Sequence, residues 1–335
     1  MARHVDAPRG LPHSEAQAPV SKYVLRRTLL TLPTLFIVSV LVFVIVRVMP
    51  GDVTNLLLQD VRYSQADAEK LRERLGIDRP VVVQYVDWVS RLARGDLGKS
   101  LVNQDPIARK VRQALPVTLE LTIFALTFTI CFAVPIGTLV AVQQDKWPDY
   151  VVRGGAVLGA SLPGFWIATV VLVLAGRFLA WSPDFEYHGL FVQPLSNLKQ
   201  FLLPAFILGI ATSASMMRLT RGMLLEVLRQ DYIRTAYAKG LRQRSVVLKH
   251  GLRNAMMPVV TVIGLHLTNL LSGTLTIEII FGLPGIGRVM IEAINNRDYP
   301  TIQTVNLLVA SSVVFVNLAV DLTYGYLDPR TKVTN

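Results

Sequence analysis

The chain has 335 residues, of which 52% are hydrophobic and only 17% are charged. A typical soluble domain carries about 25% charged residues, so this composition excludes both an ordinary soluble protein and a disordered, highly charged chain. The single cysteine excludes a disulfide framework and a cysteine-rich zinc or iron–sulfur site. The net charge of +11 is compatible with nucleic-acid binding, with binding to an acidic membrane surface, or with the orientation signal of a membrane protein.

Residues 1–20 are polar and contain three prolines, which predicts a disordered tail. Six stretches without Asp, Glu, Lys or Arg follow, each about as long as the roughly 20 residues that cross a bilayer core. They are residues 28–46, 121–144, 154–176, 200–217, 254–277 and 299–320. The sequence therefore predicts an all-α membrane protein with six transmembrane helices. The first helix lies within 21–48 and the other five lie in a core of residues 115–325.

An even number of spans places both termini on the same side of the membrane. The shorter segments on the terminal side carry 18 Lys and Arg, against 4 in the shorter segments on the other side. Long segments such as 47–120 are largely exempt from the rule that basic residues stay inside. The count predicts that both termini, including the tail 326–335, lie in the cytoplasm.

The long outer segment, residues 49–114, is predicted to be helical. A first helix is expected over 64–76. Pro80 can open a second helix with an apolar stripe, which Gly95 would end, and Pro106 can open a third helix that leads into the second span. These pieces are expected to pack on the outer mouth or on the membrane surface. A solvated loop without a role is the alternative.

The longest inner loop, residues 218–254, carries nine Lys and Arg but only two Asp and Glu. A short helix is predicted from Asp231, ended by Gly240 in a tight reversal. A helix restarts over 242–250, and Pro258 is expected to open the fifth span. A short crosswise helix of this kind could transmit force from a cytoplasmic partner to the adjoining spans. A basic loop that only binds lipid headgroups remains an equal alternative.

Two motifs of this loop resemble the coupling loop of ATP-binding-cassette importer permeases, closest to the dipeptide, oligopeptide and nickel branch. They are Arg234-Thr-Ala-Tyr-Ala-Lys-Gly-Leu241 and His250-Gly-Leu-Arg-Asn-Ala-Met-Met-Pro258. The superfamily at large has Glu-Ala where this chain has Arg234-Thr235, whereas the peptide branch reads Thr-Ala-x-Ala-Lys-Gly-Leu, as here. Further motifs of the branch occur in order at 50–52, 85–88, 95–98, 115–121, 281–287, 297–300 and 328–330.

The resemblance implies a type I importer permease in a bacterial or archaeal plasma (inner) membrane, surrounded by lipid. Its implied partners are a second related permease, two ATPase subunits and an extracytoplasmic solute-binding protein, and nucleic acid is not among them. The partner ATPases would use ATP and Mg²⁺, and this chain would bind no cofactor itself. The implied substrates are di- and oligopeptides, with nickel and oligosaccharides left open. The residues that the resemblance assigns to ATPase coupling are Arg234, Thr235, Ala236, Ala238, Lys239, Gly240 and Leu241.

Four polar residues in or at the ends of the last two spans are candidates for lining the transport path: His266, Asn269, Glu278 and Asn317. A polar or ionisable side chain at membrane depth is a pathway hypothesis by default. Hydrogen bonds between helices, or snorkelling at span ends, are the alternatives.

Enzymatic chemistry finds no support in the sequence. Residues 95–100 end like a phosphate-binding loop, but Ala93 stands where that loop needs glycine and the segment lies outside. The five histidines have no metal-ligand spacing, and no hydrolase constellation is visible. A stand-alone secondary transporter is the rival reading. It is disfavoured because neither a buried carboxylate pair nor a broken-helix repeat appears.

Overall fold

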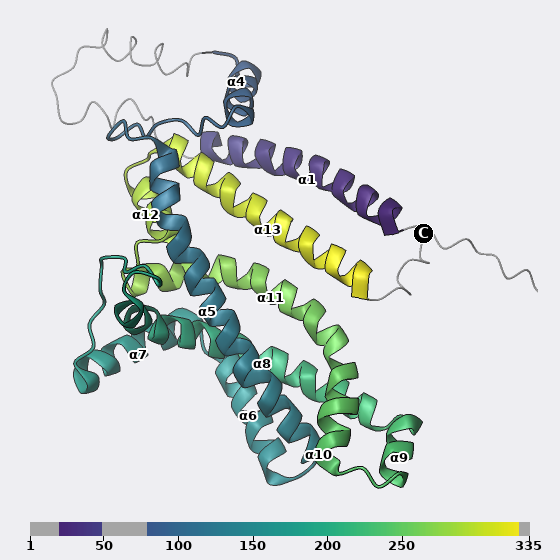
Figure 1. The fold of residues 1–335 in the computed structure, drawn as a ribbon. Coiled ribbons are helices and arrows are strands. Elements are labelled where there is room, and N and C mark those ends of the chain that lie inside the picture. Colours follow the sequence, from purple (N-terminus) through teal and green to yellow (C-terminus); the bar gives the residue numbers. More distant parts are fainter. Residues whose placement is uncertain (1–19, 49–78, 328–335) are drawn as a thin grey trace, which may run out of the picture.

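The computed structural model describes residues 20–48 and 79–327, most of which lie in helices. Within these ranges the only β-type pairing is an isolated bridge between Lys99 and Pro106. Helices α4 and α12 lie at one end of the molecule and α9 and α10 lie at the other (Figure 1). The elements in chain order are α1 (Val20–Val48), α4 (Val81–Ala93), α5 (Ile107–Val142), α6 (Trp147–Ser161), α7 (Gly164–Leu179), α8 (Pro194–Leu228), α9 (Asp231–Ala238), α10 (Gln243–Ser245), the π-helix η1 (Val246–Leu252), α11 (Arg253–Ile280), α12 (Ile286–Asn295) and α13 (Tyr299–Leu327).

The predicted all-α, multi-pass architecture is confirmed. Five helices are long and apolar enough to cross a membrane, and a sixth span results if α6 and α7 count as one. The continuous third span expected over 154–176 is wrong, because α6 and α7 meet at an angle of 98°. The break falls at Leu162, whose ψ of 133° is extended, directly before Pro163. A proline disfavours helical geometry in the residue before it, which accounts for the position of the break.

The core of the subunit is the contact between α5 and α8, which run in the same direction. A Cβ added to Gly209 would lie 2.6 Å from the Ala125 carbonyl oxygen, and one on Gly137 would lie 2.8 Å from that of Met217. Only glycine fits at these two positions, as expected where membrane helices approach closely. The main buried apolar cluster extends from this contact to α7, α11 and the turn before α12. Its members are Val117, Leu121, Ala125, Ala168, Phe201, Ala205, Ile207, Leu208, Leu270, Ile277, Phe281 and Leu283.

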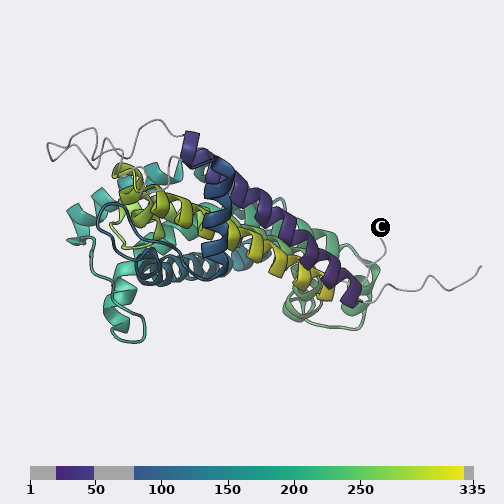
Figure 2. The same cartoon turned by 90° about the horizontal axis from the view of Figure 1, so that it is seen from above.

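Helices α1 and α13 form a second unit that lies side by side along the bundle (Figure 2). Arg27 and Asp321 form an ion pair between them, with Arg27 Nε 2.7 Å from Asp321 Oδ2. Gly264 of α11 contacts Val320 of α13 so closely that an added Cβ would collide with it. The first and last spans are therefore joined to the core mainly through α11 and α12.

The second predicted outer helix is confirmed as α4, which follows Pro80 and ends before Gly95 at φ +80°. Its Tyr85 ring packs edge-on against Phe43 of α1 at 5.1 Å, and the Tyr85 hydroxyl lies 2.7 Å from Ser39 Oγ. The third predicted outer helix is also confirmed, because α5 begins directly after Pro106. It continues without interruption into the second span, so the outer segment is rigidly joined to the core.

The predicted restart of the chain after Gly240 is confirmed by α10 and η1, which lead without a gap into α11. The expectation that Pro258 opens the fifth span is wrong, because Pro258 lies inside α11. A proline is tolerated within a membrane helix where neighbouring groups satisfy the carbonyl that it leaves free.

Several predictions fall outside the described residues. They are the N-terminal tail, the helix over 64–76, the motifs at 50–52 and 328–330, and the C-terminal tail.

Candidate functional site

Helix α9 begins at Asp231, whose carboxylate in the first turn favours the helix N-terminus. It ends in a Schellman motif, in which Gly240 N–H donates to the Tyr237 carbonyl at 2.9 Å and Leu241 N–H to the Ala236 carbonyl at 3.4 Å. Gly240 has φ +76°, and a Cβ added there would meet no atom within 4 Å. Glycine is therefore required at this position by backbone conformation and not by space.

The inner face of α9 is small and apolar. Ile233 is 1% exposed and Ala236 is 8% exposed, and both pack with Val246 of η1 and with Leu228 at the end of α8. Of the predicted coupling residues, Ala236 is therefore turned toward its own subunit. Its small size lets α9 lie close to η1, and it does not offer a surface to a partner.

The other six predicted coupling residues lie on the outside: Arg234, Thr235, Ala238, Lys239, Gly240 and Leu241. Tyr232 and Tyr237 accompany them, 43% and 44% exposed, and sequence reasoning did not single them out. The sequence does contain a signal for them, since two tyrosines in a basic, otherwise polar inner loop are unusual and suit a protein interface. The outer face of α9 is thus a compact surface with two aromatic rings.

The Tyr232 hydroxyl attaches α9 to the start of α11, and the Asn254 amide that binds it also bonds η1. Asn254 Nδ2 donates to the Tyr232 hydroxyl at 2.8 Å and to the His250 carbonyl at 3.0 Å. Gly251 of η1 contacts Leu224 and Leu228, which an added Cβ would approach to 3.1 and 3.2 Å. A displacement of α9 would therefore also displace α8 and α11.

Basic side chains surround α9. Lys239, Arg242, Arg244 and Lys249 are all exposed, and no ion pair is seen for them within the described part of the chain. Arg234 lies 3.3 Å from Asp231, but both side chains are largely exposed, so this pair restrains Arg234 little. The loop presents a positive surface that suits an acidic partner or anionic headgroups.

The four predicted pathway residues are not brought together at one place. His266 is 9% exposed, with Nε2 3.3 Å from Ser215 Oγ on α8 and with no partner for Nδ1 among the described residues. Asn269 is exposed on α11. Asn317 on α13 accepts a hydrogen bond from Thr268 at 3.1 Å, so it joins the two helices.

Glu278 is fully buried and belongs to a hydrogen-bonded cluster at the end of α11 that precedes α12. It accepts hydrogen bonds of 2.6 Å from the Thr118 hydroxyl of α5 and from Gly287 N–H of α12. Thr118 in turn accepts from Ile286 N–H at 2.9 Å. A Cβ on Gly285 would collide with the Glu278 carboxylate. The glycines of the 281–287 motif thus allow the backbone to wrap around a buried carboxylate.

A second buried carboxylate, Asp298, ties the outer segment to the turn before α13. It accepts hydrogen bonds from the Ser100 hydroxyl at 2.5 Å, from Leu101 N–H at 3.0 Å and from the Thr301 hydroxyl at 2.7 Å. Lys110 of α5 lies 4.0 Å away. The residues around 95–100 therefore form a structural tether, and sequence spacing gave no sign of this pairing across 198 positions.

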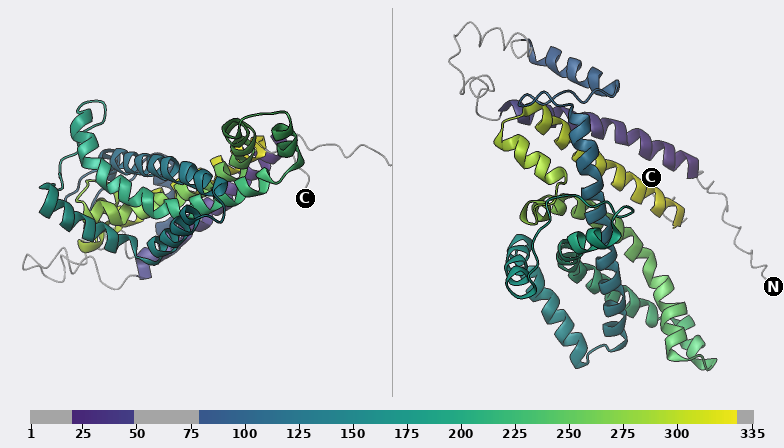
Figure 3. Two further views of the ribbon diagram at one scale, coloured as in Figure 1. Left: turned by 90° about the horizontal axis from the view of Figure 1, so that it is seen from below. Right: turned by 60° about the vertical axis from the view of Figure 1, so that its left-hand side comes forward.

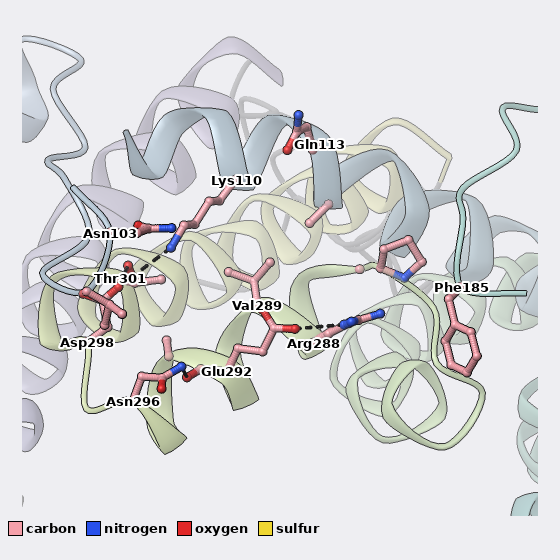
Figure 4. A pocket seen from close by; sticks show the side chains of 15 residues that line it. Asn103, Lys110, Gln113, Phe185, Arg288, Val289, Glu292, Asn296, Asp298 and Thr301 are labelled. Carbon is pink, nitrogen blue, oxygen red and sulfur yellow. Dashed lines mark hydrogen bonds and ion pairs between the residues drawn. The ribbon is translucent and has the colours of Figure 1, made fainter. Parts of the chain in front are cut away.

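A cleft of about 510 Å³ opens beside this tether, between the start of α5 and α12. Figure 4 shows Lys110 pointing toward Asp298, Arg288 bonded to Glu292 along α12, and Phe185 at one end. The charges that line the cleft are mostly paired with one another. None of the four predicted pathway residues lines it.

The loop between α7 and α8 is fastened to α5 through Glu120, which accepts from the Tyr187 hydroxyl at 3.0 Å and from Asn197 at 2.9 Å. Burial, and secondarily the Glu120 carboxylate, raises the pKa of Tyr187. In the same loop, the hydrogen bond from His188 at 2.7 Å holds the pKa of Asp184 below its usual range.

Two family profiles match the chain. Residues 133–333 match "Binding-protein-dependent transport system inner membrane component", and residues 20–122 match the N-terminal region of the same kind of component. The dipeptide transport system permease protein DppB of Alkalihalophilus pseudofirmus is 41% identical over 330 residues, covering 92% of this chain and 99% of that protein. The glutathione transport system permease protein GsiC of Escherichia coli O6:H1 is 39% identical over 313 residues, covering 92% and 98%. A crystal structure of an amino acid ABC transporter with histidines aligns with a TM-score of 0.49 at 15% identity, over 65% of this chain and 94% of that one.

Proposed function

The chain belongs to the family of binding-protein-dependent transport system inner membrane components, and from this premise we propose that it forms one half of a peptide-import path. It is a multi-pass membrane permease of the ABC peptide-importer family. The other half of the path would be a second, related permease subunit. Two cytoplasmic ATPase subunits would drive the pair with ATP and Mg²⁺, and an extracytoplasmic solute-binding protein would deliver the ligand.

The observation that carries this proposal is the outer face of α9. Six predicted coupling residues and two tyrosines are exposed there, while Ile233 and Ala236 fix the helix to α8 and η1. A rigid, exposed helix of this kind can bind in a groove of an ATPase and pass its movement to two spans. The charge count of the short segments supports a cytoplasmic position for α9 and both termini.

Short peptides are the proposed substrates because the two relatives are named for a dipeptide and for glutathione, which is itself a tripeptide derivative. Nickel and oligosaccharides are the alternatives that the resemblance leaves open. We place Asn269 on the transport path, since an amide exposed on α11 at membrane depth is costly against lipid. His266 and Asn317 would act beside it through their contacts between helices, and Glu278 would hold the outer mouth.

Reconstitution tests the proposal. The chain, its partner permease, both ATPases and the binding protein are placed in proteoliposomes, and uptake of a labelled dipeptide is measured with and without ATP. We expect uptake that requires ATP and binding protein, and competition by tripeptides and glutathione. Uptake driven by an ion gradient in vesicles that contain this chain alone would instead identify a secondary transporter. Competition only by Ni²⁺ or by oligosaccharides would reassign the substrate.

A further inference from the structure

A buried ion pair joins α6 to α8 near the end of the molecule that carries α9. Arg221 of α8 donates from Nε to Asp149 Oδ1 at 2.8 Å and from a terminal nitrogen to Asp149 Oδ2 at 2.6 Å. The Asp149 side chain is 0% exposed and that of Arg221 is 18% exposed. The two parallel bonds form the bidentate geometry that fixes the relative orientation of guanidinium and carboxylate.

The remaining acceptor positions of Asp149 are also occupied. Asp145 N–H donates to Oδ2 at 3.1 Å, and Arg153 Nε lies 3.3 Å from Oδ1. A carboxylate with four contacts from three residues is well satisfied and offers nothing to a ligand. The role of Asp149 therefore lies in joining α6 to α8.

Helix α6 has little else that fixes it. Among its described side chains only Asp149 and Ala156 are buried, whereas Trp147 and Leu158 are 75% and 71% exposed. The helix lies on the flank of the bundle, away from α1 and α13 (Figure 3). Apolar contacts are non-directional and allow sliding, so the ion pair is the contact that sets the position of α6 along α8.

The ion pair also lies close to the attachment of α9. Leu224 is one turn beyond Arg221 on α8 and packs with Val247 of η1 in one buried cluster. Leu228, a further turn on, packs with Ile233 of α9. Contacts that hold α9 and the contact that holds α6 thus lie on three successive turns of a single helix.

We propose that the Asp149–Arg221 ion pair is the joint that passes movement of α8, driven at α9, to the bent pair α6–α7. The proposal rests on the proposed function. Replacing a buried ion pair by apolar residues is often neutral for stability, so a pair that is kept for register can be removed without unfolding the protein. Asp149 and Arg221 act as positioning residues, and neither touches the substrate.

The test uses the complete complex in proteoliposomes and measures the amount of peptide imported per ATP hydrolysed. In the double variant Asp149→Leu/Arg221→Met, we expect normal assembly and thermal stability but at least a fivefold fall in this ratio. Arg221→Lys keeps the charge but cannot form the bidentate contact, and an intermediate fall is expected. Lys146→Gln is the matched control at the start of α6, because the exposed Lys146 side chain carries the same charge as Arg221 but is not among the contacts of Asp149, so its ratio should equal that of the wild type.

Three results would overturn the inference. Uptake and ATP hydrolysis in the double variant could fall by the same factor, or neither could change, which would make the pair an ordinary packing contact. Failure of the double variant to assemble would show that the pair is needed for stability, contrary to the inference. Wild-type complex that imports no peptide with ATP would contradict the proposed function itself, so the two failures are distinguishable.

Discussion

The outer and inner ends of this subunit are held together by different kinds of contact. At the outer end, the buried carboxylates of Glu278 and Asp298 accept hydrogen bonds from segments far apart in the chain. At the inner end, the buried attachment of α9 consists of two apolar side chains, Ile233 and Ala236, and the exposed Tyr232 adds a hydrogen bond to Asn254. The outer end is joined by buried hydrogen bonds between distant segments, whereas the buried contacts of α9 itself are apolar.

This difference indicates which end can move. A satisfied buried polar network has essentially one arrangement, because any shift leaves a donor or an acceptor unpaired in a medium of low dielectric constant. Apolar contacts carry no such penalty, so α9 can move together with the segments on which it packs. The hydrogen-bonded clusters of Glu278 and Asp298 therefore fix the end that carries α12, while we expect α9 to shift when a partner binds its exposed face.

The largest expected effect concerns stability at the outer end. Glu278→Ala leaves the Thr118 hydroxyl and Gly287 N–H without their buried acceptor. Each orphaned group costs about 1–3 kcal/mol, so we expect the two together to lower the free energy of unfolding by about 2–6 kcal/mol. Thermal denaturation in detergent measures it. Glu292→Ala, which removes a carboxylate that is 58% exposed on α12, is the control and should stay within about 0.5 kcal/mol of the wild type. Equal losses in both variants would contradict the conclusion that the hydrogen bonds of Glu278 fix this end of the molecule.

The second prediction concerns function at the inner end. Gly240→Pro forces φ to about −65° where the chain has +76° and removes the N–H that binds the Tyr237 carbonyl. We expect ATP-driven uptake to fall at least about tenfold, equivalent to about 1.4 kcal/mol, with normal expression. Gly240→Ala has space for its Cβ and meets only the left-handed backbone penalty of about 1–2 kcal/mol, so its loss of uptake should be smaller. Wild-type uptake by the proline variant would remove the coupling role of α9.

The third prediction compares two exposed aromatic residues, one at each end. Tyr237→Ala removes a ring from the outer face of α9, and we expect uptake to fall about threefold to tenfold because aromatic residues often dominate protein interfaces. Phe191→Ala removes a ring that is 98% exposed in the loop after α7. That variant should transport at the wild-type rate. A similar loss in both variants would mean that the effect is not specific to the exposed face of α9.

Short-range patterns in the sequence predicted where most helices begin and end, because helix ends are determined by residues close to them in the chain. The proline that opens α4 and the left-handed glycine after α9 act within a few residues, and both predictions are confirmed. Five of the six charge-free stretches likewise correspond to helices long and apolar enough to cross a membrane. The bend at Pro163 was missed, because a proline in an apolar stretch can be absorbed by a helix or break it, as Pro258 and Pro163 respectively show. Which outcome occurs depends on packing that sequence does not display.

Pairings between distant residues could not be predicted. Thr118 and Glu278 are 160 positions apart, and Asp149 and Arg221 are 72 apart. Nothing in the spacing of one sequence indicates that such residues meet, although Thr118, Glu278 and Arg221 lie in stretches that the sequence analysis did single out. The orientation of Ala236 toward η1 was missed for the same reason, because the buried face of a short helix is decided by its neighbours.

The smallest expected effect is the pH dependence of an exposed contact at the outer end. The pKa of Asp184 is lowered from its ordinary value of 3.8 mainly by the hydrogen bond from His188. A lowered native pKa gives a stabilising contribution that is present above the ordinary value and disappears as pH falls through the native value. Asp184→Asn removes this contribution, so its melting temperature should fall less steeply than that of the wild type below about pH 4. Because the Asp184 side chain is 51% exposed, the difference near pH 7 should be less than about 1 kcal/mol, well below that of Glu278→Ala. Parallel melting curves of the two proteins between pH 7 and pH 3 would show that this contact adds nothing, and a large gap at pH 7 would show that the fixed region extends into the loop before α8.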